Sequence, residues 1–168
     1  MLHVYWLSYN IIYVKMEKEI LLNEHNKQEY PPMHTAEHLL NATMDKMFGC
    51  GRAVSAHVEC KKSKCDYLFD TKPSDEELQK VADAVNAAIE ADYPVTYEYI
   101  SREDAESQFN LSKLPDAAGD TLRIVRIGDY DACPCVGLHV ASTREVGSFS
   151  IISHDFAEGR LRLRFKLK

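Results

Sequence analysis

The sequence predicts a single α+β domain in which helices pack against a largely antiparallel sheet. The chain has 168 residues, a length typical of one domain with a substantial core. Helix-like and strand-like segments follow one another as helix, strands, helix, strands, not in the strict βα repeat of a parallel sheet. Glycine and proline number 7 and 6, which are ordinary values and exclude a fibrous or low-complexity protein.

Three helices are expected. Over residues 33–48 the apolar side chains recur at steps of three and four, and glycines follow where the helix should end. A second helix begins at Ser74, which makes a capping-box pattern with Glu77. A short third helix is expected over residues 102–109, with Ser101 as its N-cap.

Strands are expected where β-branched and aromatic residues concentrate between the helices. These segments are residues 53–60, 66–69, 95–100, 121–127, 146–153 and 160–168. The last two should form a hairpin that turns near Glu158 and Gly159.

The predicted domain covers residues 33–168, and residues 1–32 are an N-terminal segment to which the sequence assigns no single structure. Residues 3–14 are apolar and aromatic, but their uninterrupted apolar runs are only four residues long. A membrane-spanning helix needs about 20 apolar residues, and a signal peptide needs a basic start and a small-residue cleavage site. Two interpretations stay open for the residues before Met16: a translation-start artefact, or a strand that pairs with the sheet.

Charge and cysteine content narrow the function classes. A net charge of −6 excludes a uniformly basic coat for nucleic acid, although a local basic patch remains compatible with it. Five cysteines form an odd set without a secretory signature, which favours a reduced compartment and metal or thiol chemistry. The sequence therefore predicts a soluble cytoplasmic protein with no membrane association.

Two short motifs supply side chains that bind metals. His34 and His38, in HTAEH, project from one face of the predicted helix because they are four residues apart. Cys135 and His139, in CPCVGLH, add a thiolate and a third imidazole, which completes a set suited to tetrahedral Zn²⁺. The alternatives without a metal are a solvated or core pair for the two histidines of HTAEH, a buried structural thiol for Cys135 and a surface position for His139. Cys133 is an alternative ligand, but the spacing of Cys135 to His139 fits better.

These motifs carry a family resemblance. HTAEHLLNATM followed by CVGLHV resembles the HxxxH and CxxxH motifs of the alanyl-tRNA synthetase editing domain. That domain also occurs in freestanding AlaX-type trans-editing proteins and, in a more distant form, in threonyl-tRNA synthetase. The segments SDEELQKVADAVNAAI, LRIVRIGD and EVGSFSIIS extend the likeness in the same order, from about residue 33 to the C-terminus.

The resemblance implies a function and a set of ligands. It implies a metal-dependent aminoacyl-tRNA deacylase that hydrolyses the ester joining a wrong amino acid, serine or glycine, to tRNA(Ala). The zinc ligands it implies are His34, His38, Cys135 and His139. The chain lacks the other parts of a synthetase and the N-terminal barrel of longer relatives, so we expect a small form that acts in trans. We expect mischarged tRNA as its partner, with no obligate protein partner and no need for ATP.

The sequence departs from the family pattern inside the second motif. The alanine branch commonly reads CGGTH, whereas this chain reads CVGLH, with Val136 and Leu138. An apolar side chain therefore replaces a hydroxyl at position 138. This difference bears on amino-acid specificity more than on metal binding.

Two residues of the first motif have candidate roles beside the ligands, where a metal-bound water is the expected nucleophile. Thr35 is a candidate partner for the substrate hydroxyl, or else a helix-surface residue. Glu37 makes HTAEH match H-x-x-E-H, a metallopeptidase signature with the glutamate as general base. That reading leaves Cys135 and His139 without a role, and a solvated helix position is the plain alternative for Glu37.

The C-terminus alternates basic and apolar residues, so one strand face would be basic. The basic residues are Arg160, Arg162, Arg164, Lys166 and Lys168. This stripe is a candidate RNA-binding surface, which Lys61, Lys62 and Lys64 could extend, and it supports a further alternative, a non-catalytic RNA-binding module stabilised by zinc. The competing interpretation is an edge strand that its cations protect from aggregation.

Overall fold

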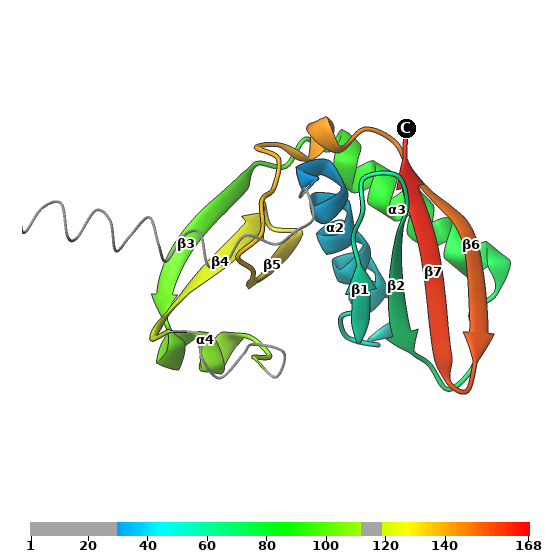
Figure 1. Ribbon diagram of the computed structural model, residues 1–168, viewed down its shortest axis with the longest axis horizontal. Helices are drawn as coiled ribbons and strands as arrows, with labels where there is room; N and C mark the ends of the chain where they lie inside the picture. Colours follow the sequence, from blue (N-terminus) through cyan, green and yellow to red (C-terminus); the bar gives the residue numbers. More distant parts are fainter. Residues whose placement is uncertain (1–29, 112–118) are drawn as a thin grey trace, which may run out of the picture.

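The computed structural model describes residues 30–111 and 119–168, so the predictions for residues 1–29 lie outside the described part. Its elements are α2 (Pro31–Phe48), β1 (Ser55–His57), β2 (Ser63–Leu68), α3 (Asp75–Glu90), β3 (Val95–Ser101), α4 (Arg102–Gln108), β4 (Thr121–Ile127), β5 (Asp131–Pro134), the 3₁₀ turn η1 (Thr143–Val146), β6 (Phe149–Ala157) and β7 (Arg160–Leu167). The strands form two antiparallel sheets, β1-β2-β7-β6 and β3-β4-β5 (Figure 1). The predicted α+β class is confirmed.

The main core lies between the four-stranded sheet and the helices α2 and α3. Alternate side chains of β7 (Leu161, Leu163 and Phe165) are fully buried on its inner face, against the apolar faces of the two helices. The prediction from the alternating apolar and basic residues is therefore confirmed: one face of β7 belongs to the core, and the other face carries the cations.

α2 begins at Pro31, two residues before the predicted start, and α3 begins where predicted. The N-cap of α2 is Tyr30, without a side-chain cap, and prolines fill its first two positions, where a missing amide is tolerated. α2 ends at Gly49, whose φ of 62° is the left-handed conformation that glycine accommodates. At α3 the Ser74 hydroxyl accepts the amide of Glu77 at 3.2 Å, and the Glu77 carboxylate accepts the amide of Ser74 at 2.8 Å. The capping box is confirmed.

The strand predictions are confirmed in place and differ in extent. β4 covers the predicted residues, whereas the first predicted strand shrinks to three exposed residues at the sheet edge. The predicted strand 146–153 is partly wrong, because Ser142 and Glu145 form a second capping box that starts η1 and delays β6 to Phe149. The hairpin turn is confirmed, with φ of 52° and 72° at Glu158 and Gly159.

The second sheet connects to α2 through β5, a strand that the sequence did not predict. α4 and the inner face of β4 form a small separate core around Ala105, Leu122 and Ile124. Beside β5, the Thr43 hydroxyl lies 2.7 Å from that of Tyr130, and Lys46 donates to the Tyr130 carbonyl. Figure 1 shows α2 between β5 and β1, so the helix that carries HTAEH faces the strand that leads into CPCVGLH.

The basic strand β7 lies between β2 and β6, so the edge-strand interpretation is wrong. Its outer face is partly neutralised. Arg162 makes two hydrogen bonds of 2.7 Å to Asp66, which Arg160 approaches at 3.5 Å. Arg164 pairs with Asp155 at 2.7 Å. Within the described ranges, no helix has the length and apolarity needed to cross a membrane.

The Asp66 pair should affect stability in a pH-dependent way. Hydrogen bonds from Arg162 hold the pKa of Asp66 below its ordinary value. The stabilisation of the fold by ionised Asp66 is therefore fully present above the pKa that Asp66 has in the unfolded chain. It is lost as the pH falls through the lower pKa of Asp66 in the folded protein. We expect Asp66→Asn to lower the free energy of unfolding by about 1–2 kcal/mol at neutral pH, and the difference from wild type to shrink below pH ~4, as measured by urea unfolding.

The matched control is Asp155→Asn. Asp155 also pairs with an arginine of β7, but its side chain is 57% exposed, against 4% for Asp66. An exposed pair contributes little, so this variant should unfold like wild type. Equal losses for the two variants would contradict the burial argument.

Candidate metal centre

The two motifs meet at one point of the fold. The structure brings His34, His38, Cys135 and His139 together so that one ligand atom of each lies within 4.8 Å of all the others. Cys135 Sγ lies 3.4 Å from His34 Nε2 and 3.5 Å from His139 Nε2. The two imidazoles of the first motif project from the beginning of α2, and the thiol and the third imidazole follow β5.

A second contact holds each imidazole through Nδ1. His34 Nδ1 lies 3.2 Å from the Leu138 carbonyl, and His38 Nδ1 lies 3.2 Å from the Asp131 carboxylate. His139 Nδ1 lies 3.1 Å from the Thr35 hydroxyl. Carbonyl and carboxylate oxygens only accept, so the first two rings donate through Nδ1, and Nε2 is the nitrogen that a metal ion would take. Oxygen partners of this kind fix metal-binding histidines in proteins.

Two of the spacings between donor atoms fit zinc. With Zn–N near 2.05 Å and Zn–S near 2.3 Å, tetrahedral coordination would separate a nitrogen and a sulfur ligand by about 3.6 Å. The two Cys135 Sγ to Nε2 distances of 3.4 and 3.5 Å are close to that value. Three imidazoles and one thiolate are also a ligand set that zinc accepts.

The loop that carries Cys135 is held by the neighbouring strand. Arg123 of β4 donates to the Cys135 carbonyl at 2.7 Å and also to the Gly137 carbonyl. Gly137 has to be glycine, because a Cβ there would overlap the imidazole ring of His34. Arg123 itself lies 4.8 Å from the ring centre of Tyr97. Nothing in the sequence pattern pointed to Arg123, whereas Gly137 was visible as the family-like glycine of the motif.

Side chains of the cluster have shifted pKa values even without a metal. Burial raises the pKa of Cys135, but hydrogen bonds from His139 and His34 outweigh it and lower the pKa to about 3. Burial lowers the pKa of His38, but Asp131 outweighs it, and the result is well above the ordinary value. Burial lowers the pKa of His139. The metal-free cluster thus contains a thiolate beside a protonated imidazole, and metal binding would displace that proton.

Asp131 is the main functional residue that the sequence did not reveal. Its carboxylate is 6% exposed and contacts both His38 and Arg52, the latter at 2.7 Å. Burial raises its pKa, but His38 and Arg52 outweigh burial and lower it. An acidic residue four positions before Cys135 was the available signal.

Cys133, the alternative ligand, lies beside the cluster. Its Sγ lies 3.5 Å from His38 Nδ1. Cys133, His38 and Asp131 form a second, buried group of candidate ligands. Asp131 is already paired with Arg52. Cys135 is the cysteine that lies among all three imidazoles.

A cleft of about 280 Å³ opens beside the cluster, between α2, β1 and β5. Its wall includes His34, His38 and Cys135, with Glu37 and Arg52. Thr35 does not line it. This residue is fully buried, so the helix-surface interpretation is wrong, and its hydroxyl is occupied by His139 and the amide of Val140.

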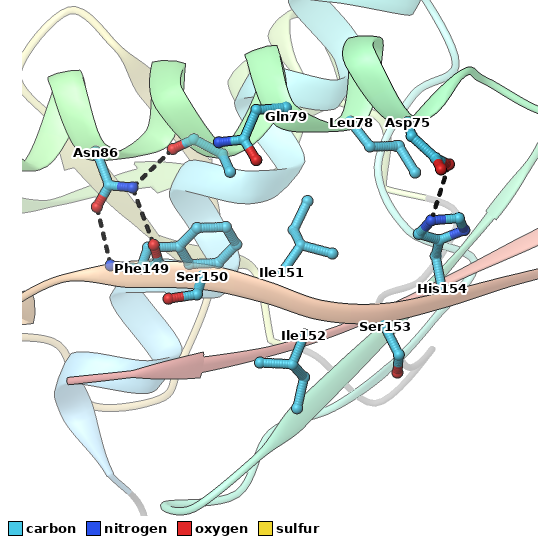
Figure 2. A pocket seen from close by; sticks show the side chains of 11 residues that line it. Asp75, Leu78, Gln79, Asn86, Phe149, Ser150, Ile151, Ile152, Ser153 and His154 are labelled. Atoms are coloured by element: carbon cyan, nitrogen blue, oxygen red, sulfur yellow. Dashed lines mark hydrogen bonds and ion pairs between the residues drawn. The ribbon is translucent and has the colours of Figure 1, made fainter.

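A larger cavity of about 680 Å³ lies elsewhere, between α3 and β6. Figure 2 shows that two of its polar side chains make contacts within the fold: Asn86 bonds the backbone of Phe149, and His154 pairs with Asp75. The candidate metal groups found in the described residues do not include its lining residues. We therefore assign the chemistry to the smaller cleft.

The fold and the site define a small α+β domain with a three-histidine, one-cysteine centre, and comparison with known proteins agrees with the sequence motifs. Residues 122–163, which include Cys135 and His139, match the threonyl and alanyl tRNA synthetase second additional domain. The chain is 30% identical over 161 residues to the alanine–tRNA ligase of Desulfitobacterium hafniense (strain Y51), covering 95% of this chain and 18% of that protein. It is 35% identical over 132 residues to the enzyme of the same name from Ligilactobacillus salivarius (strain UCC118), covering 78% and 15%.

The resemblance inferred from the two motifs is confirmed: the chain is similar to the threonyl and alanyl tRNA synthetase second additional domain and to alanine–tRNA ligases. It spans less than a fifth of the length of the curated relatives named above. The alignments extend over most of this chain, so the similarity includes the region of both motifs in the Desulfitobacterium hafniense protein.

The thiolate can be tested by titration. In metal-free protein we expect the ultraviolet absorbance of the Cys135 thiolate to persist far below the ordinary thiol pKa of ~8.5 and to disappear only near the folded-state value of about 3. Cys135→Ser should abolish this signal, whereas Cys60→Ser, at an exposed thiol, should leave it intact. Titration of Cys135 near the ordinary value would show that the histidines do not stabilise the thiolate.

Proposed function

We propose that the protein is a zinc-dependent hydrolase that cleaves the ester of mischarged aminoacyl-tRNA in trans. Ser-tRNA(Ala) is the first candidate substrate and Gly-tRNA(Ala) the second, with the cytoplasm as the place of action. The observation that carries the proposal is the convergence of His34, His38, Cys135 and His139 beside an open cleft. Similarity to alanine–tRNA ligases supplies the substrate class.

The protein's own groups would prepare the reaction by fixing the ligands. Asp131 holds His38 and Thr35 holds His139, while the Leu138 carbonyl holds His34. Zinc, when bound, would supply the chemistry that ester hydrolysis requires, by lowering the pKa of a coordinated water or polarising a carbonyl oxygen. With four candidate ligands this requires a fifth coordination position or one side chain that does not coordinate. The open side of the cluster leads into the cleft, where the 3′ end of the substrate would enter.

The rest of the tRNA would contact the outer face of the four-stranded sheet. This face carries the five basic residues of the C-terminal stripe together with Lys64, which lies opposite Arg164 in the β2–β7 pairing. Asp66 and Asp155 offset part of this charge. Within the described part of the chain Lys64 and Lys166 have no ion pair, so they are better candidates for phosphate contacts than Arg162, which Asp66 already engages.

The activity is tested with purified Ser-, Gly- and Ala-tRNA(Ala) and Ser-tRNA(Thr). We expect zinc-loaded protein to deacylate Ser-tRNA(Ala) and to spare Ala-tRNA(Ala). Chelation or Cys135→Ala should reduce the rate at least about 100-fold, as expected when an electrostatic catalyst is lost. Cys60→Ala is the matched control and should retain full activity, because Cys60 is exposed and outside the cluster.

Turnover that is insensitive to the chelator and to Cys135→Ala would overturn the zinc mechanism. Cleavage of peptides without cleavage of any aminoacyl ester would favour the peptidase alternative. tRNA binding that survives metal removal, with no ester hydrolysed, would favour the RNA-binding module.

The sheet face is tested by charge reversal. Lys166→Glu should weaken tRNA binding several-fold and reduce the slope of log affinity against log salt by about one. Lys80→Glu reverses an exposed charge on α3, which covers the opposite face of the sheet, and should change neither quantity. Equal effects of the two variants would show a general charge effect and remove the sheet face from the proposal.

A further inference from the structure

We propose that Glu37 and Asn41 form a subsite for the free α-ammonium group of the aminoacyl ester. The inference rests on the proposed function and specifies the chemical class of its substrate: esters of amino acids with an unblocked amine. Nothing in the ligand set itself requires this discrimination.

Glu37 lies in the reaction cleft. It precedes the ligand His38 on α2, and both line the same cavity of about 280 Å³. It is also one helical turn from His34, a spacing that puts side chains about 5–6 Å apart. A small substrate with its carbonyl at the cluster would therefore have its α-substituents within reach of the Glu37 carboxylate.

Asn41 holds this carboxylate in place. The Asn41 side-chain oxygen accepts the amide of Ala53 at 2.8 Å and the hydroxyl of Tyr67 at 3.1 Å. Because an amide proton can only be donated, the assignment of this oxygen is fixed, and the Asn41 NH₂ group must point to Glu37, to which it donates. Asn41 is 2% exposed and Tyr67 is fully buried, so the support is rigid.

Glu37 makes no ion pair with Arg52, the arginine of the cleft, although the two charges attract each other. Arg52 also lines the cleft, but its guanidinium is bonded to Asp131 at 2.7 Å. Among the residues that the structure describes, Glu37 has no ion pair, and its only hydrogen bond is to the neutral Asn41. A carboxylate held beside a reaction site by a neutral donor is suited to bind an ammonium group from the substrate.

The consequence is a discrimination by the amine. An N-acylated ester lacks the positive charge and keeps only one of the three N–H donors that Glu37 could bind. Its acyl group would also cover the carboxylate without compensating the carboxylate's charge. The site should therefore spare esters whose amine is blocked, such as peptidyl or formylated aminoacyl esters. This selectivity would come from Glu37 and not from the zinc ligands.

The test compares Ser-tRNA(Ala) with N-acetyl-Ser-tRNA(Ala) as substrates of zinc-loaded protein. Wild type should prefer the free amine. Glu37→Gln keeps the shape and removes the charge, and it should lower kcat/KM for the free amine on the order of 10- to 100-fold, as for loss of a hydrogen bond to a charged group. It should leave kcat/KM for the acetylated ester nearly unchanged. Glu98→Gln, at an exposed glutamate paired with Arg126, is the matched control and should preserve the preference.

Other results of this test would overturn either the subsite or the proposed function, and the two cases can be told apart. An equal loss on both esters would make Glu37 a general base or a structural residue, and no loss on either would remove it from the site; both overturn the subsite. If wild type hydrolyses neither ester, the proposed function fails. Binding of a non-hydrolysable amide-linked seryl adenosine and its N-acetyl form then decides the subsite, because only the free amine should lose affinity in Glu37→Gln.

Discussion

The candidate site depends on one buried carboxylate. Asp131 accepts hydrogen bonds from His38 on α2 and from Arg52 after that helix, while it stands itself at the start of β5. A nearly buried anion of this kind requires both partners. By satisfying it, the chain fixes the distance between the helix with the first histidine pair and the strand that leads to Cys135. The same interaction at Asp131 therefore orients His38 and holds the two motifs together.

The second motif is held in place by Arg123 and by the small size of Gly137. Arg123 bonds two carbonyls on the segment between Cys135 and His139, and Gly137 allows that segment to lie against His34. The side chains at the intervening positions are left outside: Val136 is 86% exposed and Leu138 is 57% exposed. The apolar side chains at these two positions therefore change the exposed surface between the candidate ligands Cys135 and His139 and leave those two residues in place.

The sequence revealed the parts of this protein that local patterns encode. Helical periodicity, the Ser74 capping box and the alternation of β7 each predicted an element that the structure contains, because the signal lies within a few residues. The ligands were visible because His and Cys at these spacings are chemically unusual. Asp131 and Arg123 were not visible, since their roles come from pairings between distant strands and helices. The placement of β7 inside its sheet also depends on pairings that no local pattern encodes.

The two prolines at the start of α2 have an effect beyond ending the preceding segment. A helix N-terminus usually presents free amides that attract phosphate, but Pro31 and Pro32 have none, and the amides of Met33 and His34 both bond the Tyr30 carbonyl. The positive end of the helix dipole remains and suits the nearby thiolate. With no amide donors on offer, this helix end is a poor anchor for a nucleotide backbone, so any phosphate contact made at this end of α2 would have to come from side chains.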